Sequence, residues 1–205
     1  MKLKLTVIAV ITMVAGMVST SILADNHSMS EEKKKEIAEK MMQAAQPGEE
    51  HKLLRNLEGK WTCTSQFWME PGAKAMSVDW ACDAEMILGG RFLHIASVSA
   101  SKDMPGENLT IFGYDRRFGK FTMVGFDTWG TYFVTSEGEF DPRTRTISFY
   151  GEDYDPIAGF TQKWRTEMRI PDNDTFYLDL YFTDDVMSKG QDEFKMASMI
   201  YKREK

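Results

Sequence analysis

The stretch LEGKWTCTSQFW, residues 57–68, marks the point at which the sequence changes its pattern. Before Leu57 apolar residues recur at helical spacing, whereas from Trp61 onward apolar and polar residues alternate. Gly59 stands at the change, where a glycine can separate two elements. The alternation then continues to the end of the chain, with turn residues about every ten positions. The sequence therefore predicts a helical segment followed by an all-β domain.

All predicted strands are joined by short connections rich in Gly, Pro, Asp and Asn, the residues of tight turns. Because no strand is followed by a crossover helix, the sheet is expected to be antiparallel. A single sheet of this many strands has two exposed edges unless it closes, so we expect an up-and-down β-barrel, with a two-layer sandwich as the alternative. The predicted strands are 60–69, 75–87, 91–101, 108–115, 120–127, 131–140, 145–152, 160–170, 175–182 and 192–203.

The first 24 residues have the pattern of a secretory signal peptide, with Lys2 and Lys4 before an apolar run and small residues up to Ala24. An uncleaved anchor is the alternative, since about 20 apolar residues span a bilayer. We expect an exported protein, periplasmic or secreted, with no membrane span once the signal is removed. A helix is expected over 29–46, capped by Ser28, and a shorter one over 49–57. The predicted parts are a signal peptide (1–24), an N-terminal helical segment (25–58) and a β-barrel domain (59–205).

The chain has 205 residues and a formal net charge of −6. Scattered charges of this sign argue against nucleic acid and anionic lipid as partners. The three histidines and two cysteines do not have the spacing of a metal site, and no cofactor is expected. No Gly-x-Ser-x-Gly elbow or phosphate-binding glycine loop is present, so we assign no catalytic residue. The sequence assigns no oligomeric state.

The two cysteines, Cys63 and Cys82, fall in the first two predicted strands. If residues 71–74 form the turn, the cysteines lie directly opposite each other on one face, within reach of a disulfide. An oxidising compartment favours that bond. Two reduced thiols in the core are the alternative.

A ten-stranded barrel is wide enough to leave an internal cavity. The strand FTQKWRTEMRI alternates cleanly, which indicates one buried and one wet face. Methionines and aromatic residues on the buried faces suit a flexible apolar ligand, although they also fill cores. The residues expected to face inward include Phe160, Gln162, Trp164, Thr166, Met168 and Ile170, and Phe194, Met196 and Ile200 in the last strand.

Five residues are candidates for contacting a ligand. Arg91 follows two glycines and could hold a carboxylate, or form an ion pair with an acidic neighbour. His94 is expected to share a face with Phe92, and its alternative role is structural. Trp129 lies in a loop at one end of the barrel, where it could flank a cavity or plug it. Glu137 is expected to face solvent or else an internal cation. The fifth candidate is Trp164 on the predicted inner face.

The motif Gly59-Lys60-Trp61, after a short helix, resembles the signature of lipocalins and other calycins. The resemblance implies that Trp61 packs across the closed base of the barrel. It also implies that a basic side chain from the end of the last strand, Lys202 or Arg203, covers this tryptophan.

A closer resemblance covers most of the chain after the predicted signal. Six motifs in order are similar to those of the domain of unknown function 1579 family, which implies a compact lipocalin-type barrel whose biochemical role is not established. These motifs are Pro47-Gly48-Glu49-Glu50-His51, Gly59-x-Trp61, Leu88-Gly89-Gly90-Arg91-Phe92-Leu93, Gly113-Tyr114-Asp115, Asp127-Thr128-Trp129-Gly130-Thr131 and Ser136-Glu137-Gly138.

These observations predict non-catalytic binding or carriage of a small hydrophobic or amphipathic molecule. A first alternative is an enzyme, such as an isomerase or hydrolase, that uses Glu137 or His94 inside the barrel. A second alternative is a structural or adaptor protein of the cell envelope, in which the barrel is solid and the helix at 30–46 binds a partner.

Overall fold

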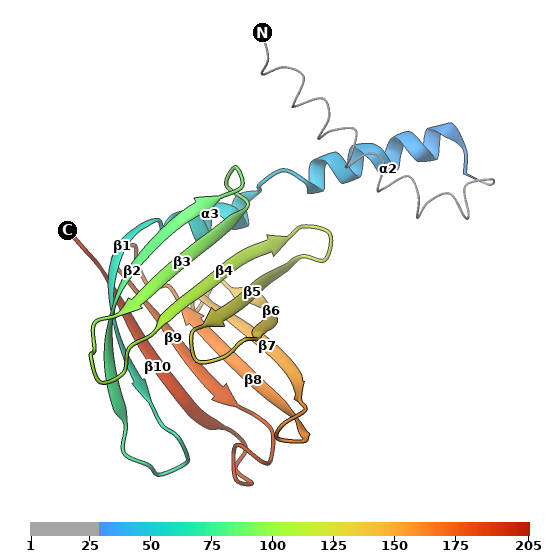
Figure 1. Ribbon diagram of the computed structural model, residues 1–205. Coiled ribbons are helices and arrows are strands. Elements are labelled where there is room, and N and C mark those ends of the chain that lie inside the picture. Colours follow the sequence, from blue (N-terminus) through green and yellow to red (C-terminus); the bar gives the residue numbers. More distant parts are fainter. Residues whose placement is uncertain (1–28) are drawn as a thin grey trace. The chain divides into compact units, whose positions relative to one another are not determined.

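The structure is a computed structural model, and it describes residues 29–205 (Figure 1). The predicted signal peptide and the predicted cap Ser28 lie outside the described residues. The chain divides into two units, one ending at Ala45 and the other spanning Gln46–Lys205. The first unit contains α2 (Glu31–Ala44), which begins at the cap Ser30. No helix in the described part is long and apolar enough to cross a membrane.

The second unit is a closed, antiparallel barrel in which each strand pairs with its neighbours in sequence and β1 pairs with β10. This closure confirms the predicted up-and-down barrel, and the sandwich alternative is wrong. A short helix, α3 (Glu49–Arg55), precedes the barrel and packs on β2, β3 and β4. The strands are β1 (Gly59–Phe67), β2 (Met76–Ile87), β3 (Phe92–Ser99), β4 (Glu107–Asp115), β5 (Lys120–Asp127), β6 (Phe133–Asp141), β7 (Thr146–Asp155), β8 (Phe160–Arg169), β9 (Thr175–Phe182) and β10 (Phe194–Arg203).

The two ends of the barrel differ in their connections (Figure 1). We call the end next to α3 the base, where β1 begins and β10 finishes. The opposite end is the mouth. Its five loops are 68–75, 100–106, 128–132, 156–159 and 183–193.

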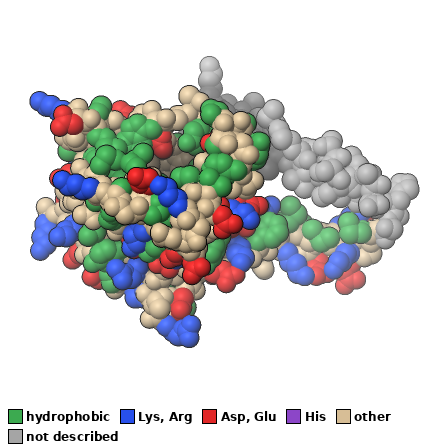
Figure 2. Space-filling view, turned by 90° about the horizontal axis from the view of Figure 1, so that it is seen from below, with side chains coloured by type: hydrophobic (Ala, Val, Ile, Leu, Met, Phe, Trp, Pro, Cys, Tyr) green, Lys and Arg blue, Asp and Glu red, His purple; other side chains and the backbone are tan. Residues whose placement is uncertain are grey.

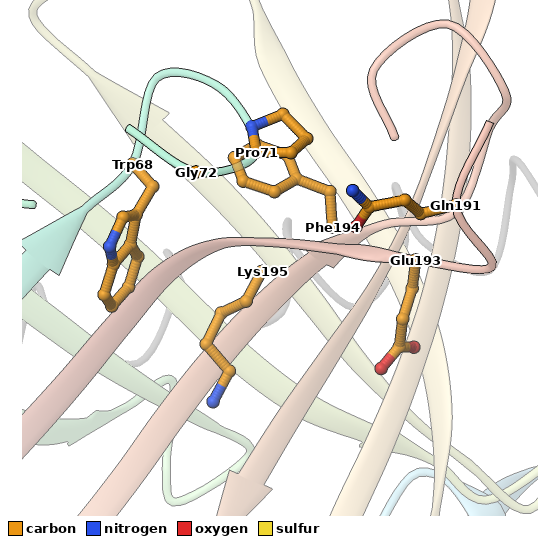
Figure 3. Close-up of a pocket in the computed structure, with 7 residues that line it drawn as sticks. All are labelled: Trp68, Pro71, Gly72, Gln191, Glu193, Phe194 and Lys195. Atoms are coloured by element: carbon orange, nitrogen blue, oxygen red, sulfur yellow. The ribbon is translucent and has the colours of Figure 1, made fainter. Parts of the chain in front are cut away.

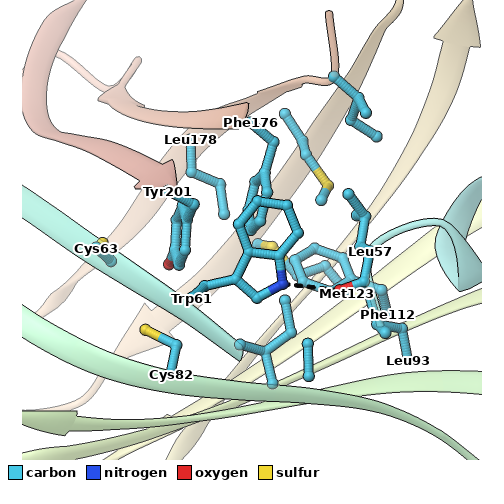
Figure 4. Packing of buried hydrophobic residues seen from close by; sticks show 14 of the residues in the cluster. Leu57, Trp61, Cys63, Cys82, Leu93, Phe112, Met123, Phe176, Leu178 and Tyr201 are labelled. Atoms are coloured by element: carbon cyan, nitrogen blue, oxygen red, sulfur yellow. Dashed lines mark hydrogen bonds between the residues drawn. The ribbon is translucent and has the colours of Figure 1, made fainter. Parts of the chain in front are cut away.

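The base is closed by a fully buried tryptophan, Trp61 (Figure 4). Its indole Nε1 donates to the carbonyl of Leu57 at 2.9 Å, and its ring meets Phe176 edge-on at 4.9 Å between centroids. Phe176 in turn stacks on Tyr201. Aromatic pairs of this geometry add to the stability that burial alone provides. The base half of the barrel is therefore a packed core.

Arg203 covers Trp61 from outside, with its guanidinium carbon 4.2 Å from the ring centroid. The guanidinium also donates to the carbonyls of Asn56, Glu58 and Asn173. The last residue of β10 thus ties together the start of β1 and the β8–β9 turn. This is the arrangement that the lipocalin resemblance implies.

Cys63 and Cys82 do not have the predicted relation. The loop between their strands, 68–75, is longer than the expected turn, so Cys63 lies opposite Trp80 and Cys82 lies opposite Trp61. The prediction that the cysteines oppose each other directly is therefore wrong by two residues. A shift of two keeps both cysteines on the inner face. Both are buried, free thiols in place of the predicted disulfide.

The last strand, β10, also departs from its predicted alternation. A register shift between Lys195 and Ala197 inserts one extra residue, and such a bulge reverses which residues face inward. Phe194 is buried as predicted, but after the bulge Ala197 replaces Met196 on the inner face. Ile200 is exposed for the same reason, so its predicted inward orientation is wrong.

Candidate functional site

Large hydrophobic side chains that remain exposed concentrate at the mouth. Figure 2 looks at this end and shows hydrophobic side chains gathered on it. Exposed apolar surface of this kind marks binding sites more often than it marks inert surface. On the barrel unit these residues lie in three places: Met69, Met76, Phe126, Trp129, Tyr132, Phe133, Tyr154, Ile157 and Val186 at the mouth (here called the apolar rim), Leu88 and Phe118 at the base, and Val98, Tyr150 and Ile200 along the outer wall.

Trp129 reaches across part of the mouth. It comes from the β5–β6 loop, yet its ring meets Trp80 of β2 at 5.8 Å and Phe67 of β1 at 6.4 Å between centroids. Its Nε1 donates to the carbonyl of Pro105 at 3.4 Å, and its backbone N–H donates to the carboxylate of Asp127. The side chain is still 52% exposed. Trp129 is thus an aromatic cover on one side of the opening.

Behind the apolar rim, the inner wall carries hydroxyl groups, and some of them are fully paired. Ser65 is completely buried. Its Oγ donates to the carbonyl of Val78 at 2.9 Å and accepts from Nε1 of Trp80 at 2.7 Å. This serine is a structural link between β1 and β2.

Two other inner-wall hydroxyls have no such partners. Oγ of Ser136 on β6 and Oγ1 of Thr166 on β8 are buried and make no hydrogen bond within the described part of the chain. The residues are only 4% and 2% exposed. A buried hydroxyl without a partner costs about 1–3 kcal/mol. Unmet hydrogen-bonding groups in a folded protein call for an explanation, and a bound ligand supplies one.

The wall between these hydroxyls is shaped by a glycine. Gly151 on β7 pairs with Trp164 on β8, and a Cβ at Gly151 would lie 2.5 Å from Cε2 of that indole. The indole therefore lies directly against the strand that separates β6 from β8. Ser136 lies on the inner face of β6, and Trp164 and Thr166 lie on the inner face of β8, with β7 between them. We call these three residues the hydroxyl patch.

An open pocket of about 270 Å³ lies at the rim, between the β1–β2 and β9–β10 loops (Figure 3). Its floor includes Phe194, the buried residue just before the β10 bulge. An ion pair between Lys189 and Glu70 joins the same two loops. The pocket is lined by Trp68, Pro71, Gly72, Gln191, Glu193, Phe194 and Lys195.

The structure places the five sequence candidates in three different regions. Trp164 lies on the inner wall and Trp129 at the mouth, in the region of the hydroxyl patch and the apolar rim. Arg91 lies in the β2–β3 turn at the base, where it donates to the carbonyl of Leu88. Glu137 is exposed on the outer face of β6, as its solvated alternative predicts.

His94 lies on the outer face of β3, because Leu93 and Ile95 occupy the inner face. Its Nδ1 is 4.0 Å from the carboxylate of Glu85 on β2. His94 shares its face with Phe92, as expected, but that face is the outer one. The two groups named for acid–base chemistry, His94 and Glu137, both lie outside the barrel.

The polar groups at the base are paired with one another. His51 of α3 is buried, and its Nδ1 accepts from the backbone N–H of Gly48 at 3.0 Å. Burial holds the pKa of His51 below its ordinary value of 6.5. Arg116 from the β4–β5 turn donates to the carbonyl of Gln46. These contacts fasten the segment containing α3 to the base.

The hydrogen bond between the two inner thiols shifts their pKa values in opposite directions, lowering that of Cys82. A hydrogen bond with Cys82, together with burial, raises the pKa of Cys63. Burial also raises the pKa of the neighbouring Tyr201 well above its ordinary value. A thiol is reactive as its thiolate, which these surroundings disfavour at Cys63. Within residues 29–205, no group of three or more His, Cys, Asp or Glu side chains is placed to hold a metal ion.

No match was found among curated proteins. A family model does match, described as a protein of unknown function (DUF1579), and the match covers residues 46–203. That range contains the whole barrel together with α3. The chain therefore belongs to the DUF1579 family.

Proposed function

We propose that the protein binds and carries a small amphipathic molecule at the mouth end of its barrel. The observation that carries this proposal is the pair of unpartnered buried hydroxyls, Ser136 and Thr166, behind an exposed apolar rim. A molecule with an apolar body and one polar group would complement both features.

The energetics favour such a ligand. Burying apolar surface stabilises by about 25 cal/mol per Å², and the exposed aromatic side chains of the rim offer that surface. A hydrogen bond from the ligand would also remove the cost of the unpaired hydroxyls. The base has a packed core, and of the exposed hydrophobic residues Leu88 and Phe118 lie at that end. Nδ1 of His94, on the outer face near the base, also lacks a hydrogen-bond partner in the described residues, but it does not line the interior.

We further propose that binding takes place outside the cytoplasm, in the periplasm or the surrounding medium. The support for this is the signal-like pattern of residues 1–24. An exported protein meets apolar molecules in an aqueous space, where a carrier is useful.

The test is titration of the purified protein with an environment-sensitive apolar fluorophore such as 1-aminoanthracene. We expect saturable binding with one probe per chain. Trp129→Ala, at the mouth, should weaken binding about tenfold, which corresponds to the loss of one well-buried aromatic contact. Phe118→Ala is the matched control, because Phe118 is a 72% exposed aromatic residue in a base turn.

Two results would contradict the proposal. One is the absence of saturable binding to the parent protein. The other is an equal effect of Trp129→Ala and Phe118→Ala, which would mean that the mouth has no special role.

A further inference from the structure

We infer that the polar group of the ligand is uncharged, and that this group is bound by the hydroxyls of Ser136 and Thr166 inside the barrel. The inference rests on the proposed function and narrows it from an amphipathic molecule to a neutral amphiphile. A long-chain alcohol, an ester and an amide share the required chemistry, which is a neutral oxygen beside an apolar chain.

The first argument is the lack of a cation on the inner wall. In residues 29–205 the strand alternation turns every lysine and histidine of the barrel strands to the outer face. Arg203, whose guanidinium lies over Trp61, is at the base and donates to backbone carbonyls. A carboxylate brought into the barrel would therefore lose its hydration without gaining a counter-ion, which is strongly unfavourable.

The second argument concerns the charges around the entrance. Alternation places Asp127 and Asp153 on the same faces of their strands as Gly125 and Gly151, at the mouth end. Both aspartates are exposed. Their negative charges would oppose the entry of an anionic head group.

Two of the lysines at the mouth are already paired, whereas Lys74 and Lys102 are exposed in the 68–75 and 100–106 loops and do not lie on the inner wall. Nζ of Lys195 lies 3.1 Å from the carboxylate of Asp179 on the outer wall. Lys189 is held by Glu70 between two loops.

The third argument is the chemistry of the patch itself. Ser136 and Thr166 can each donate one hydrogen bond and accept others, so either can pair with an alcohol, which donates and accepts, or with a carbonyl oxygen, which accepts. The neighbouring wall is apolar: Thr166 pairs across the strands with Phe149 and Leu180. A neutral oxygen on an apolar chain matches this surface.

The test is displacement of the fluorophore from the parent protein by three ligands of equal chain length: decan-1-ol, methyl decanoate and decanoate at pH 8. We expect the alcohol and the ester to bind at least about tenfold more tightly than the anion, since an unpaired charge in the barrel costs more than one hydrogen bond contributes. Tighter binding of decanoate, or equal binding of all three, would overturn the inference. Failure of the fluorophore itself to bind would instead contradict the proposed function.

A double variant, Ser136→Ala with Thr166→Val, tests the location. It should reduce affinity for decan-1-ol about tenfold and leave that for decanoate unchanged, because only the neutral ligand uses the hydroxyls. The matched control is Thr135→Val with Ser148→Ala, which changes the same residue types on the outer faces of β6 and β7. Unchanged affinity for the alcohol in a double variant that unfolds at the parent's urea concentration would also overturn the inference. The comparison of the three ligands on the parent protein does not depend on this variant.

Discussion

The base and the mouth of this barrel each contain a tryptophan, but the two tryptophans have different surroundings and different roles. At the base, the indole of Trp61 is buried, donates to a carbonyl and is covered by Arg203. At the mouth, the indole of Trp129 is half exposed and covers one side of the opening. The base is built for stability, because Trp61, His51 and Arg203 each have hydrogen-bond partners there. The mouth keeps apolar surface and hydrogen-bonding capacity free, and proteins tolerate such costs mainly at functional sites.

The same contrast holds between two serines on the inner wall. Ser65 donates and accepts hydrogen bonds within the barrel, whereas Oγ of Ser136 has no partner in the described residues. Both are buried and both lie mid-strand. Burial alone therefore does not identify a structural residue, and the pairing of its polar atoms must be considered as well.

The largest expected difference in stability is between the variants that lack Trp61 and Trp129. Trp61→Ala should lower the free energy of unfolding by about 3–5 kcal/mol, the usual cost of removing a large aromatic side chain from a core. Trp129→Ala should lower it by less than about 1 kcal/mol, since much of that side chain is already in water. Urea titration followed by circular dichroism measures both. Similar losses in the two variants would contradict the distinction between the ends.

Replacing Ser65 and replacing Ser136 should change the free energy of unfolding in opposite directions. Ser65→Ala leaves Nε1 of Trp80 and the carbonyl of Val78 without their partner and should cost about 1–3 kcal/mol. Ser136→Ala removes an unpaired hydroxyl, so it should leave stability unchanged or raise it by up to about 1 kcal/mol. The same urea titration applies. A clear loss of stability in Ser136→Ala would show that its hydroxyl has a structural partner after all.

The smallest expected effect is the pH dependence of the free energy of unfolding that His51 produces at the base. Because burial lowers the folded-state pKa of His51, the unfolded chain takes up its proton first as the pH falls. The contribution of His51 to the free energy of unfolding should therefore have its full value above about pH 6.5. Below that pH it should decline by at most about 1.4 kcal/mol per pH unit. Around the ring, Glu50 opposes the shift, and Arg116, Arg91 and Arg55 reinforce it.

The measurement is urea unfolding at several values between pH 5 and pH 7, a window set by the ordinary pKa of about 6.5 for histidine. His51→Gln should flatten the dependence in this window. Lys52→Gln, an exposed change on the same helix, should retain the slope of the parent. A flat profile for the parent itself would mean that His51 is not buried in its neutral form. Paired carboxylates such as Asp115, with a pKa of about 2, lose their contribution only at lower pH.

The fold was largely predictable because the strand boundaries are set by local chemistry. The predicted spans of β5 and β9 match the observed ones, since Gly, Pro, Asp and Asn flank both strands. Closure followed from the number of strands and the short connections. The β10 bulge was not predictable, because an inserted residue leaves no mark in the alternation until the partner strand is known. The same holds for the β1–β2 register, which depends on how the 68–75 loop folds.

The candidate site was predictable only in part. Trp129 and Trp164 were identified from their position in a loop and in a clean alternation. The shared face of Phe92 and His94 was predicted, but whether it is the inner face was not, because β3 is apolar on both faces and its period does not distinguish Phe92 from Leu93. Thr166 was on the predicted inner face, but nothing in the sequence shows that its hydroxyl lacks a partner. That property depends on which groups the neighbouring strands bring opposite it.

The most direct test of the central claim is fluorine NMR of protein labelled with 5-fluorotryptophan, titrated with decan-1-ol. The five tryptophans sample both ends of the barrel. We expect the resonances of Trp80, Trp129 and Trp164 to shift with a common saturation curve while that of Trp61 stays in place. A shift of the Trp61 resonance alone, or no shift in any of the five, would contradict binding at the mouth.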